Sequence, residues 1–160
     1  MAIQSLATLL DRKVNSVKMK IGNFGSFDPE LKRLNIVGLD GTSKLDEEIW
    51  KEYYGHWDKL AYDARIILAE LKHNTIEEVA GIDTTNLPQG LERERVVKQR
   101  INQTFFRNAV LSSYSSRCCM TGICESQLLE AAHIVSWSDD EANRTNPSNG
   151  LCMNVLMHRA

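Results

Sequence analysis

Three residues near the end of the 160-residue chain are notable for their chemistry and order: His133, Asn149 and His158. The apolar stretch 128–135 predicts a short strand that carries His133 near its end, and the polar stretch 139–148 predicts a loop. Asn149 follows this loop, and a second apolar element then leads to His158. A histidine on a strand, an asparagine after a loop and a histidine on a following helix are the parts of a one-metal phosphodiesterase site.

Each of these residues has a role that such a site needs. One histidine takes a proton from water, the asparagine holds that histidine or the loop, and the second histidine, with a carboxylate, anchors a divalent cation. Each also has a plain structural interpretation. His133 alone would suit a protein core, Asn149 with Gly150 would suit a turn, and His158 would suit the solvated surface.

Three segments in this order resemble the HNH endonuclease family, whose catalytic unit is the ββα-metal fold: LLEAAHIVSW, NPSNGLCMN and HRA. More narrowly, the chain resembles bacterial HNH proteins of the restriction endonuclease type. The further segments that carry this likeness are RINQTFFRNAVLSSYSSRCCMTG, LATLLDRKVNSVKMKIGNFGSFDP and SKLDEEIW. The resemblance implies a metal-dependent DNA endonuclease, a hydrolase of restriction or antiphage defence. Its cofactor would be one divalent metal ion, Mg²⁺ or Mn²⁺, with Zn²⁺ as another option.

The resemblance also assigns roles by position. His133 matches the first histidine of the motif and would be the general base that activates water. Asn149 matches the central asparagine and would orient the site, and His158 matches the last histidine and would bind the metal. Many HNH proteins have an acidic metal ligand just before the base, where this chain has Ala132. Glu130 lies two residues earlier, on the same strand face as Ala132, and is the candidate replacement.

The expected fold class is α+β, with a mostly helical N-terminal region and a small C-terminal ββα-metal module. We expect a helical domain over 1–80, a linker rich in turn-forming residues over 81–90, and an HNH nuclease domain over 91–160. Because the family pattern continues with Phe-Asp after the final residue, the resemblance predicts a module that is truncated at its last helix.

The N-terminal region begins with helical periodicity over 3–10, and Asn15 is expected to cap a second helix that ends at Gly22. Two short helices joined by a turn resemble a helix-turn-helix, in which Lys18 and Lys20 would contact DNA phosphates. A helical hairpin with a solvated basic face is the equal alternative. The stretch 23–42 is expected to be a loop.

Further helices are expected over 44–54, after a capping box that begins at Ser43, and over 57–73. The stretch 91–107 predicts an amphipathic helix with a basic outer face, on which Arg100 and Arg107 are candidate DNA contacts. A solvated face of ion pairs is the alternative.

The net charge of −2, from 19 basic and 21 acidic residues, excludes a wholly basic nucleic-acid binder, so DNA contacts must come from local patches. No apolar run approaches the length of a membrane span. The N-terminus lacks the pattern of a secretory signal, so we expect a cytoplasmic protein. The four cysteines form no Cys-x-x-Cys pair, which favours reduced and mostly buried thiols, with a zinc site of Cys118, Cys124 and Cys152 as the alternative.

The expected partner is DNA rather than a membrane, and a homodimer would allow both strands of a duplex to be cut. Two other functions remain open at this point. The first is a non-catalytic DNA-binding protein that carries an inert HNH remnant, and the second is an assembly module that binds no DNA.

Overall fold

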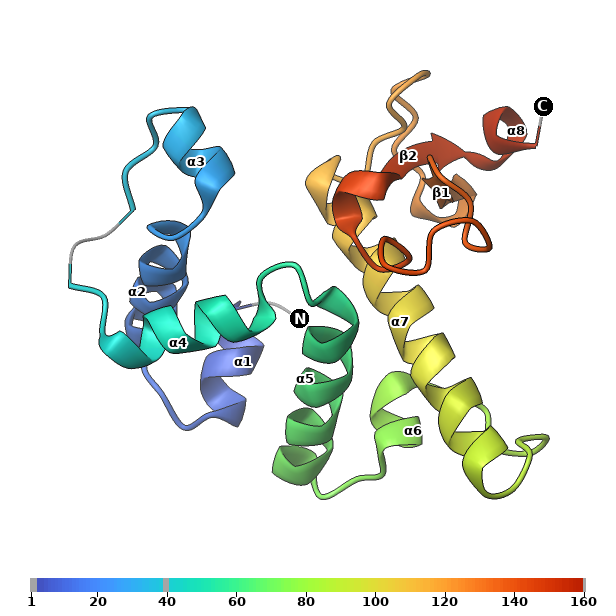
Figure 1. Ribbon diagram of the computed structural model, residues 1–160, viewed down its shortest axis with the longest axis horizontal. Coiled ribbons are helices and arrows are strands. Elements are labelled where there is room, and N and C mark those ends of the chain that lie inside the picture. The colour runs from blue at the N-terminus through green and yellow to red at the C-terminus, as the bar shows by residue number, and fades with distance from the viewer. Residues whose placement is uncertain (1–2, 39–40, 160) are drawn as a thin grey trace.

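The computed structural model describes residues 3–38 and 41–159, so positions 39–40 of the expected loop and the terminal Ala160 lie outside the described residues. Helices make up most of the described chain, and one two-stranded sheet lies near the C-terminus (Figure 1). This arrangement confirms the α+β class. Within the described ranges, no helix combines the length and the apolar character needed to cross a membrane.

Among the described residues, six helices precede the long helix that supports the sheet. Their bounds are α1 Ile3–Leu9, α2 Val14–Gly25, α3 Pro29–Arg33, α4 Lys44–Tyr53, α5 Trp57–Lys72 and α6 Ile76–Ala80. The helices expected over 3–10, 44–54 and 57–73 are confirmed as α1, α4 and α5. The capping box is also present, since the Ser43 hydroxyl accepts from the Asp46 amide while the Asp46 carboxylate accepts from the Ser43 amide.

Two expectations for the N-terminal region are wrong. The second helix begins after Lys13 rather than at an Asn15 cap, and it continues past Gly22 to Gly25. The expected loop over 23–42 contains α3, because Asp28 accepts from the Glu30 amide and Pro29 occupies the first helical position. These residues form an N-terminal helix signal as well as a turn signal.

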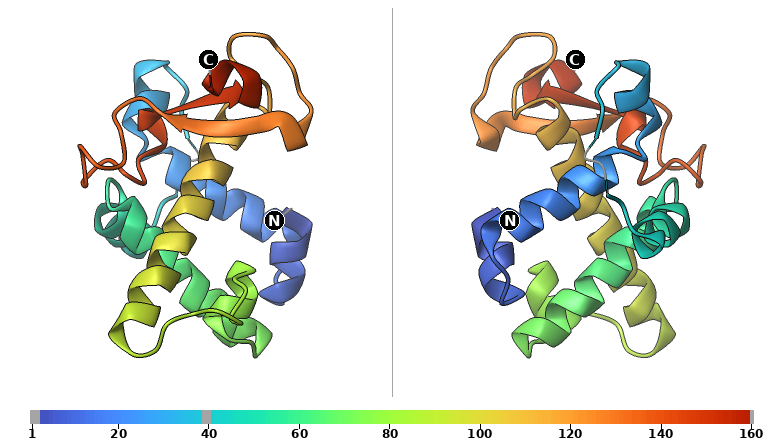
Figure 2. Two further views of the ribbon diagram at one scale, coloured as in Figure 1. Left: turned by 90° about the vertical axis from the view of Figure 1, so that its right-hand side faces the viewer. Right: turned by 90° about the vertical axis from the view of Figure 1, so that its left-hand side faces the viewer.

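Helix α7 spans Leu91–Ser113 and continues beyond the predicted end at 107. Strands β1 (Leu129–His133) and β2 (Gly150–Asn154) pair antiparallel, and α8 (Val155–His158) follows directly. The sheet lies across the C-terminal half of α7, as both views in Figure 2 show. The order strand, loop, strand, helix is the ββα arrangement that the sequence predicts.

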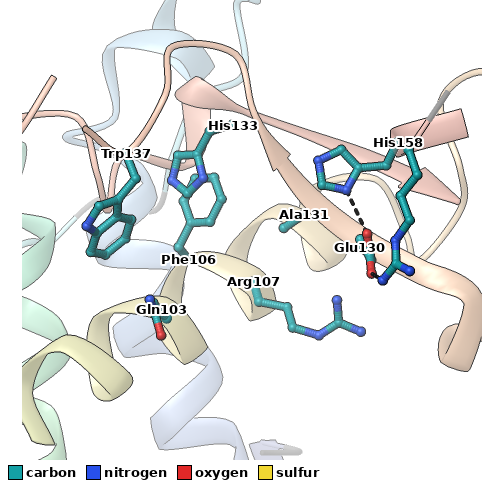
Figure 3. A pocket seen from close by; sticks show the side chains of 9 residues that line it. Gln103, Phe106, Arg107, Glu130, Ala131, His133, Trp137 and His158 are labelled. Carbon is teal, nitrogen blue, oxygen red and sulfur yellow. Dashed lines mark hydrogen bonds and ion pairs between the residues drawn. The ribbon is translucent and has the colours of Figure 1, made fainter. Parts of the chain in front are cut away.

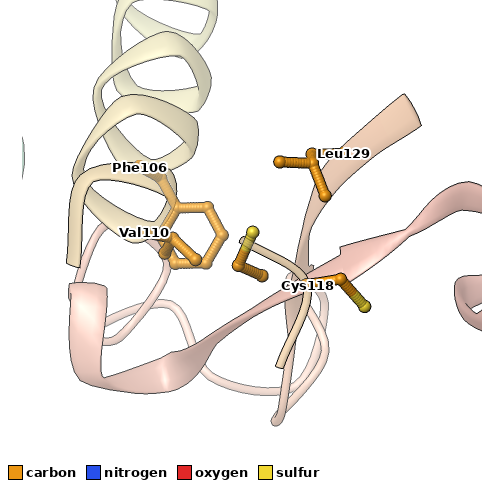
Figure 4. Packing of buried hydrophobic residues seen from close by; sticks show 5 residues of the cluster. Phe106, Val110, Cys118 and Leu129 are labelled. Atoms are coloured by element: carbon orange, nitrogen blue, oxygen red, sulfur yellow. The ribbon is translucent and has the colours of Figure 1, made fainter. Parts of the chain in front are cut away.

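Two hydrophobic clusters hold these elements together. One lies between α7 and the sheet, and its buried members are Phe106, Val110, Cys118, Leu129 and Cys152 (Figure 4). The other joins α5 and α6 to the first half of α7. Helix α7 therefore belongs to both clusters, and it connects the helical region to the sheet. The division into domains at 81–90 stays a prediction.

Candidate functional site

A cleft of about 550 Å³ lies between α7, β1 and α8 (Figure 3). Its lining includes four residues that the sequence singled out: His133, His158, Glu130 and Arg107. The other lining residues are Gln103, Phe106, Ala131, Trp137 and Arg159. The ββα arrangement thus brings a potential base, a potential ligand pair and a cation to one surface.

Contacts on several sides fix the imidazole of His133. Its Nε2 lies 2.9 Å from the carbonyl oxygen of Arg144. Its ring stacks on Phe106, with centroids 3.8 Å apart and planes inclined by 8°, and Trp137 meets it edge-on at 5.7 Å. Because a carbonyl oxygen only accepts, Nε2 must carry the proton, and Nδ1 of the neutral ring keeps its lone pair. The geometry therefore orients an imidazole whose Nδ1 can accept a proton.

Asn149 is buried, and its side chain binds the loop that follows β1. Its Oδ1 accepts from the Val135 amide at 2.8 Å, and its Nδ2 donates to the carbonyl oxygens of Val135 at 3.1 Å and Asn143 at 3.3 Å. The amide group thus closes the loop between the two strands. Since Arg144 lies in this loop, Asn149 holds in place the segment whose carbonyl orients His133.

Glu130 and His158 are in direct contact across the cleft from His133 (Figure 3). The Glu130 Oε2 atom lies 2.6 Å from the His158 Nδ1 atom, and Arg159 lies 3.6 Å from the other carboxylate oxygen. The hydrogen bond from His158, followed by the positive charge of Arg159, lowers the pKa of Glu130 below its ordinary value. A carboxylate and an imidazole therefore lie side by side, and the carboxylate is in its ionised form.

These two side chains suit a divalent cation that takes part of its coordination from the protein and part from water or phosphate. A carboxylate oxygen and an imidazole nitrogen are ordinary ligands of Mn²⁺ and related ions, and Mg²⁺ is commonly held by one or two protein groups together with substrate phosphates. In the described part of the chain, no group of three or more His, Cys, Asp or Glu residues could hold a metal. Two donors are fewer than the three protein ligands of a typical catalytic zinc site, so water or substrate phosphate would have to complete the coordination of an ion here.

The cysteines do not form the alternative zinc site, because the described residues contain no such ligand group. Cys118 and Cys152 are buried in the cluster beneath the sheet, whereas Cys119 and Cys124 are exposed, and all four are free thiols. The expectation of reduced thiols agrees with this arrangement, although only two of them are buried.

Of the four basic residues expected to contact DNA, Arg107 is the one that lines the cleft. Lys18 is exposed on α2, and the neighbouring Lys20 forms an ion pair of 2.7 Å with Asp46. Arg100 is exposed on α7, about two helical turns before Arg107. Arg107 therefore shares a cleft with His133 and His158. The DNA contacts of all four basic residues stay predictions.

Sequence reasoning did not identify two of the groups that orient His133. Phe106 shows in the sequence only as one apolar residue on the inner face of an amphipathic helix. Arg144 acts through its main-chain carbonyl, which leaves no trace in residue type. The Arg144 side chain has a second role, since its Nε atom donates to the Trp137 carbonyl at 2.6 Å. This contact joins the loop to the tryptophan that covers the ring.

Comparison with known proteins agrees with this geometry. Residues 118–160, which contain both strands and α8, match the family model of the HNH endonucleases. This C-terminal segment is therefore similar to the HNH endonucleases, a family of nucleases that act on DNA and generally use a divalent metal ion. No curated protein and no solved structure matches the chain. The likeness to the bacterial restriction type stays a prediction.

Proposed function

We propose that this protein is a metal-dependent DNA endonuclease that hydrolyses phosphodiester bonds in the cleft between α7, β1 and α8. The observation that carries the proposal is the orientation of His133, whose Nε2 is bound to the Arg144 carbonyl in a cleft that also contains Glu130, His158 and Arg107. A fixed imidazole beside a cation and a potential metal pair is suited to activating water against a phosphate.

In this mechanism His133 accepts a proton from water at Nδ1, and the resulting imidazolium is stabilised by the Arg144 carbonyl oxygen at Nε2. Phe106 and Trp137 restrict the ring to one plane, and Asn149 keeps the loop in place. Arg107 is placed to bind a phosphate oxygen. In-line attack by water would leave a 3′-hydroxyl and a 5′-phosphate, as the family resemblance implies.

Glu130 and His158 would hold the divalent cation, which we propose to be Mg²⁺ or Mn²⁺, with Zn²⁺ as the other option. When bound, the cation supplies positive charge for the phosphate and the leaving oxygen. The mutual contact of Glu130 and His158 would then be replaced by contacts to the ion. A role in restriction or antiphage defence is the biological context that we propose, and cutting both strands of a duplex would involve a second copy of the chain.

Nicking of a supercoiled plasmid tests the proposal directly. The wild-type chain should relax the plasmid in Mn²⁺ or Mg²⁺ and be inactive in EDTA. His133→Ala should lower the rate by about 10²–10⁴-fold, the usual contribution of a general base. His56→Ala is the matched control, because His56 is exposed just before α5 and should leave the rate unchanged.

Two outcomes would contradict the proposal. Nicking by His133→Ala at the wild-type rate would remove the proposed base. Salt-dependent DNA binding by the wild type, without cleavage in any divalent cation, would instead favour the non-catalytic DNA-binding function.

A further inference from the structure

Helix α8 carries His158 but has only four residues, Val155–His158, so it cannot be stable by itself. Asn154 caps it, since Asn154 Oδ1 accepts from the amides of Leu156 and Met157, each at 3.1 Å. The place of His158 beside Glu130 therefore depends on what holds Asn154.

Asn154 is only 3% exposed, and its other groups bind a turn that is distant in the sequence. Its Nδ2 donates to the Thr121 hydroxyl at 2.9 Å, and its main-chain N–H donates to the Cys118 sulfur at 3.3 Å. One asparagine side chain thus caps the helix with its oxygen and binds the turn with its nitrogen.

The turn over 118–123 is itself well fixed. The Cys118 amide donates to the Ile123 carbonyl at 2.8 Å, and the Gly122 amide donates back to the Cys118 carbonyl at 2.9 Å. The Cys119 amide donates to the Cys152 carbonyl of β2, also at 2.8 Å. Because the Cys118 side chain is buried in the cluster under the sheet, the turn is a rigid support for whatever it binds (Figure 4).

We propose that Asn154 and Thr121 are positioning residues for His158: with Cys118 they connect the start of α8 to the 118–123 turn, and this connection holds the imidazole beside Glu130. This inference rests on the proposed function, because His158 and Glu130 are the proposed metal ligands. Neither Asn154 nor Thr121 lines the cleft, so they act through α8 and not on the substrate.

Substitutions separate the cap from the connection to the turn. Asn154→Asp keeps an oxygen that caps α8 but lacks the nitrogen that binds Thr121. Thr121→Val removes the hydroxyl at constant shape from an exposed position, and Thr121→Ser restores it. Val97→Ala is the control for general destabilisation, because Val97 is buried in the other cluster.

Two measurements report on the position of the His158 ring in the absence of DNA. One is the nuclear Overhauser effect between the His158 ring and the Glu130 side chain in the metal-free protein, and the other is the dissociation constant of Mn²⁺ from calorimetry. We expect Asn154→Asp and Thr121→Val to lose the Overhauser effect and to weaken Mn²⁺ binding by about 10–100-fold, as removal of a group behind a ligand does. Thr121→Ser and Val97→Ala should retain both.

The inference is overturned if Asn154→Asp and Thr121→Val, folded by circular dichroism, keep the Overhauser effect and bind Mn²⁺ like the wild type. Loss of both signals in Val97→Ala would also overturn it, because general loosening would then explain the effect. Wild-type protein that binds no Mn²⁺ would refute the proposed function instead, and the Overhauser comparison alone would then decide the positioning role.

Discussion

His133 and Gly150 lie directly opposite each other in the two-stranded sheet. Phe106 of α7 contacts both positions, since its ring stacks on His133 and its Cζ atom lies 2.8 Å from where a Cβ on Gly150 would be. Such a Cβ would also clash with Cγ2 of Val110. Glycine at 150 therefore allows the sheet to approach α7 closely enough for Phe106 to support the imidazole.

Gly150→Ala should therefore damage both stability and activity. Overfilling a packed interior costs about 1–3 kcal/mol, so the midpoint of thermal unfolding should fall, and the displaced Phe106 ring should slow plasmid nicking further than the lost stability explains. Circular dichroism and nicking on the same samples check this. Gly25→Ala is the matched control, because the nearest atom to its added Cβ would lie at an ordinary contact distance of 3.4 Å, and an unaltered Gly150→Ala protein would contradict the packing argument.

Asn149→Asp should loosen the loop that carries the Arg144 carbonyl. The substitution keeps an acceptor for the Val135 amide, but it places a carboxylate against two carbonyl oxygens that now receive hydrogen bonds. Leaving these buried carbonyl oxygens without a hydrogen-bond donor should lower the free energy of unfolding by about 1–3 kcal/mol. We expect faster amide hydrogen exchange over 134–149 and reduced nicking. Ser148→Ala changes an exposed neighbour and should do neither, and a protected loop in Asn149→Asp would show that Asn149 does not hold it.

Acid should destabilise the helical region through Asp46. The hydrogen bond from Lys20 lowers the pKa of Asp46 from 3.8 to about 2. The unfolded chain therefore takes up this proton before the folded one, so the stabilising contribution is complete above pH 3.8 and is lost as the pH falls toward 2. Thermal melts at several pH values should show a shallower decline in this window for Asp46→Asn than for the wild type.

Glu48→Gln removes an exposed carboxylate from the same helix and should keep the wild-type acid sensitivity. Equal slopes for Asp46→Asn and the wild type would exclude Asp46 as the acid-sensitive group.

The turn that supports α8 should contain a thiolate at neutral pH. The Thr121 hydroxyl, helped by main-chain amides, lowers the pKa of Cys118 from 9.0 to about 6, whereas burial raises the pKa of Cys152. Absorbance at 240 nm should therefore show one thiol that ionises near pH 6, and this step should be absent in Cys118→Ser. Thr121→Val should move it upward, while Thr121→Ser should not. Ionisation of all four thiols near pH 9 would contradict the assignment.

The sequence alone predicts the α+β class, the strand that carries His133, the loop after it and the helix that carries His158. The strand and the loop follow from local patterns, because apolar runs and turn formers act within a few positions of one another, whereas the ββα module and its last helix come from the family resemblance. Local signals also have limits here. The stretch 23–42 contains both turn and helix signals, and in the structure the Glu30 amide donates a hydrogen bond to the Asp28 carboxylate, which caps α3.

The candidate site also combines residues that the sequence predicts with contacts that only the tertiary structure shows. Residue types and their order pointed to His133, Asn149 and His158, because base, amide and ligand chemistry belongs to the side chains themselves, and the family resemblance added Glu130. Tertiary structure alone decides that Glu130 faces His158, that Phe106 supports the His133 ring, and that the Arg144 carbonyl fixes its tautomer. These contacts join residues far apart in the chain or use main-chain atoms common to every residue, so only the packing of the sheet on α7 brings them together.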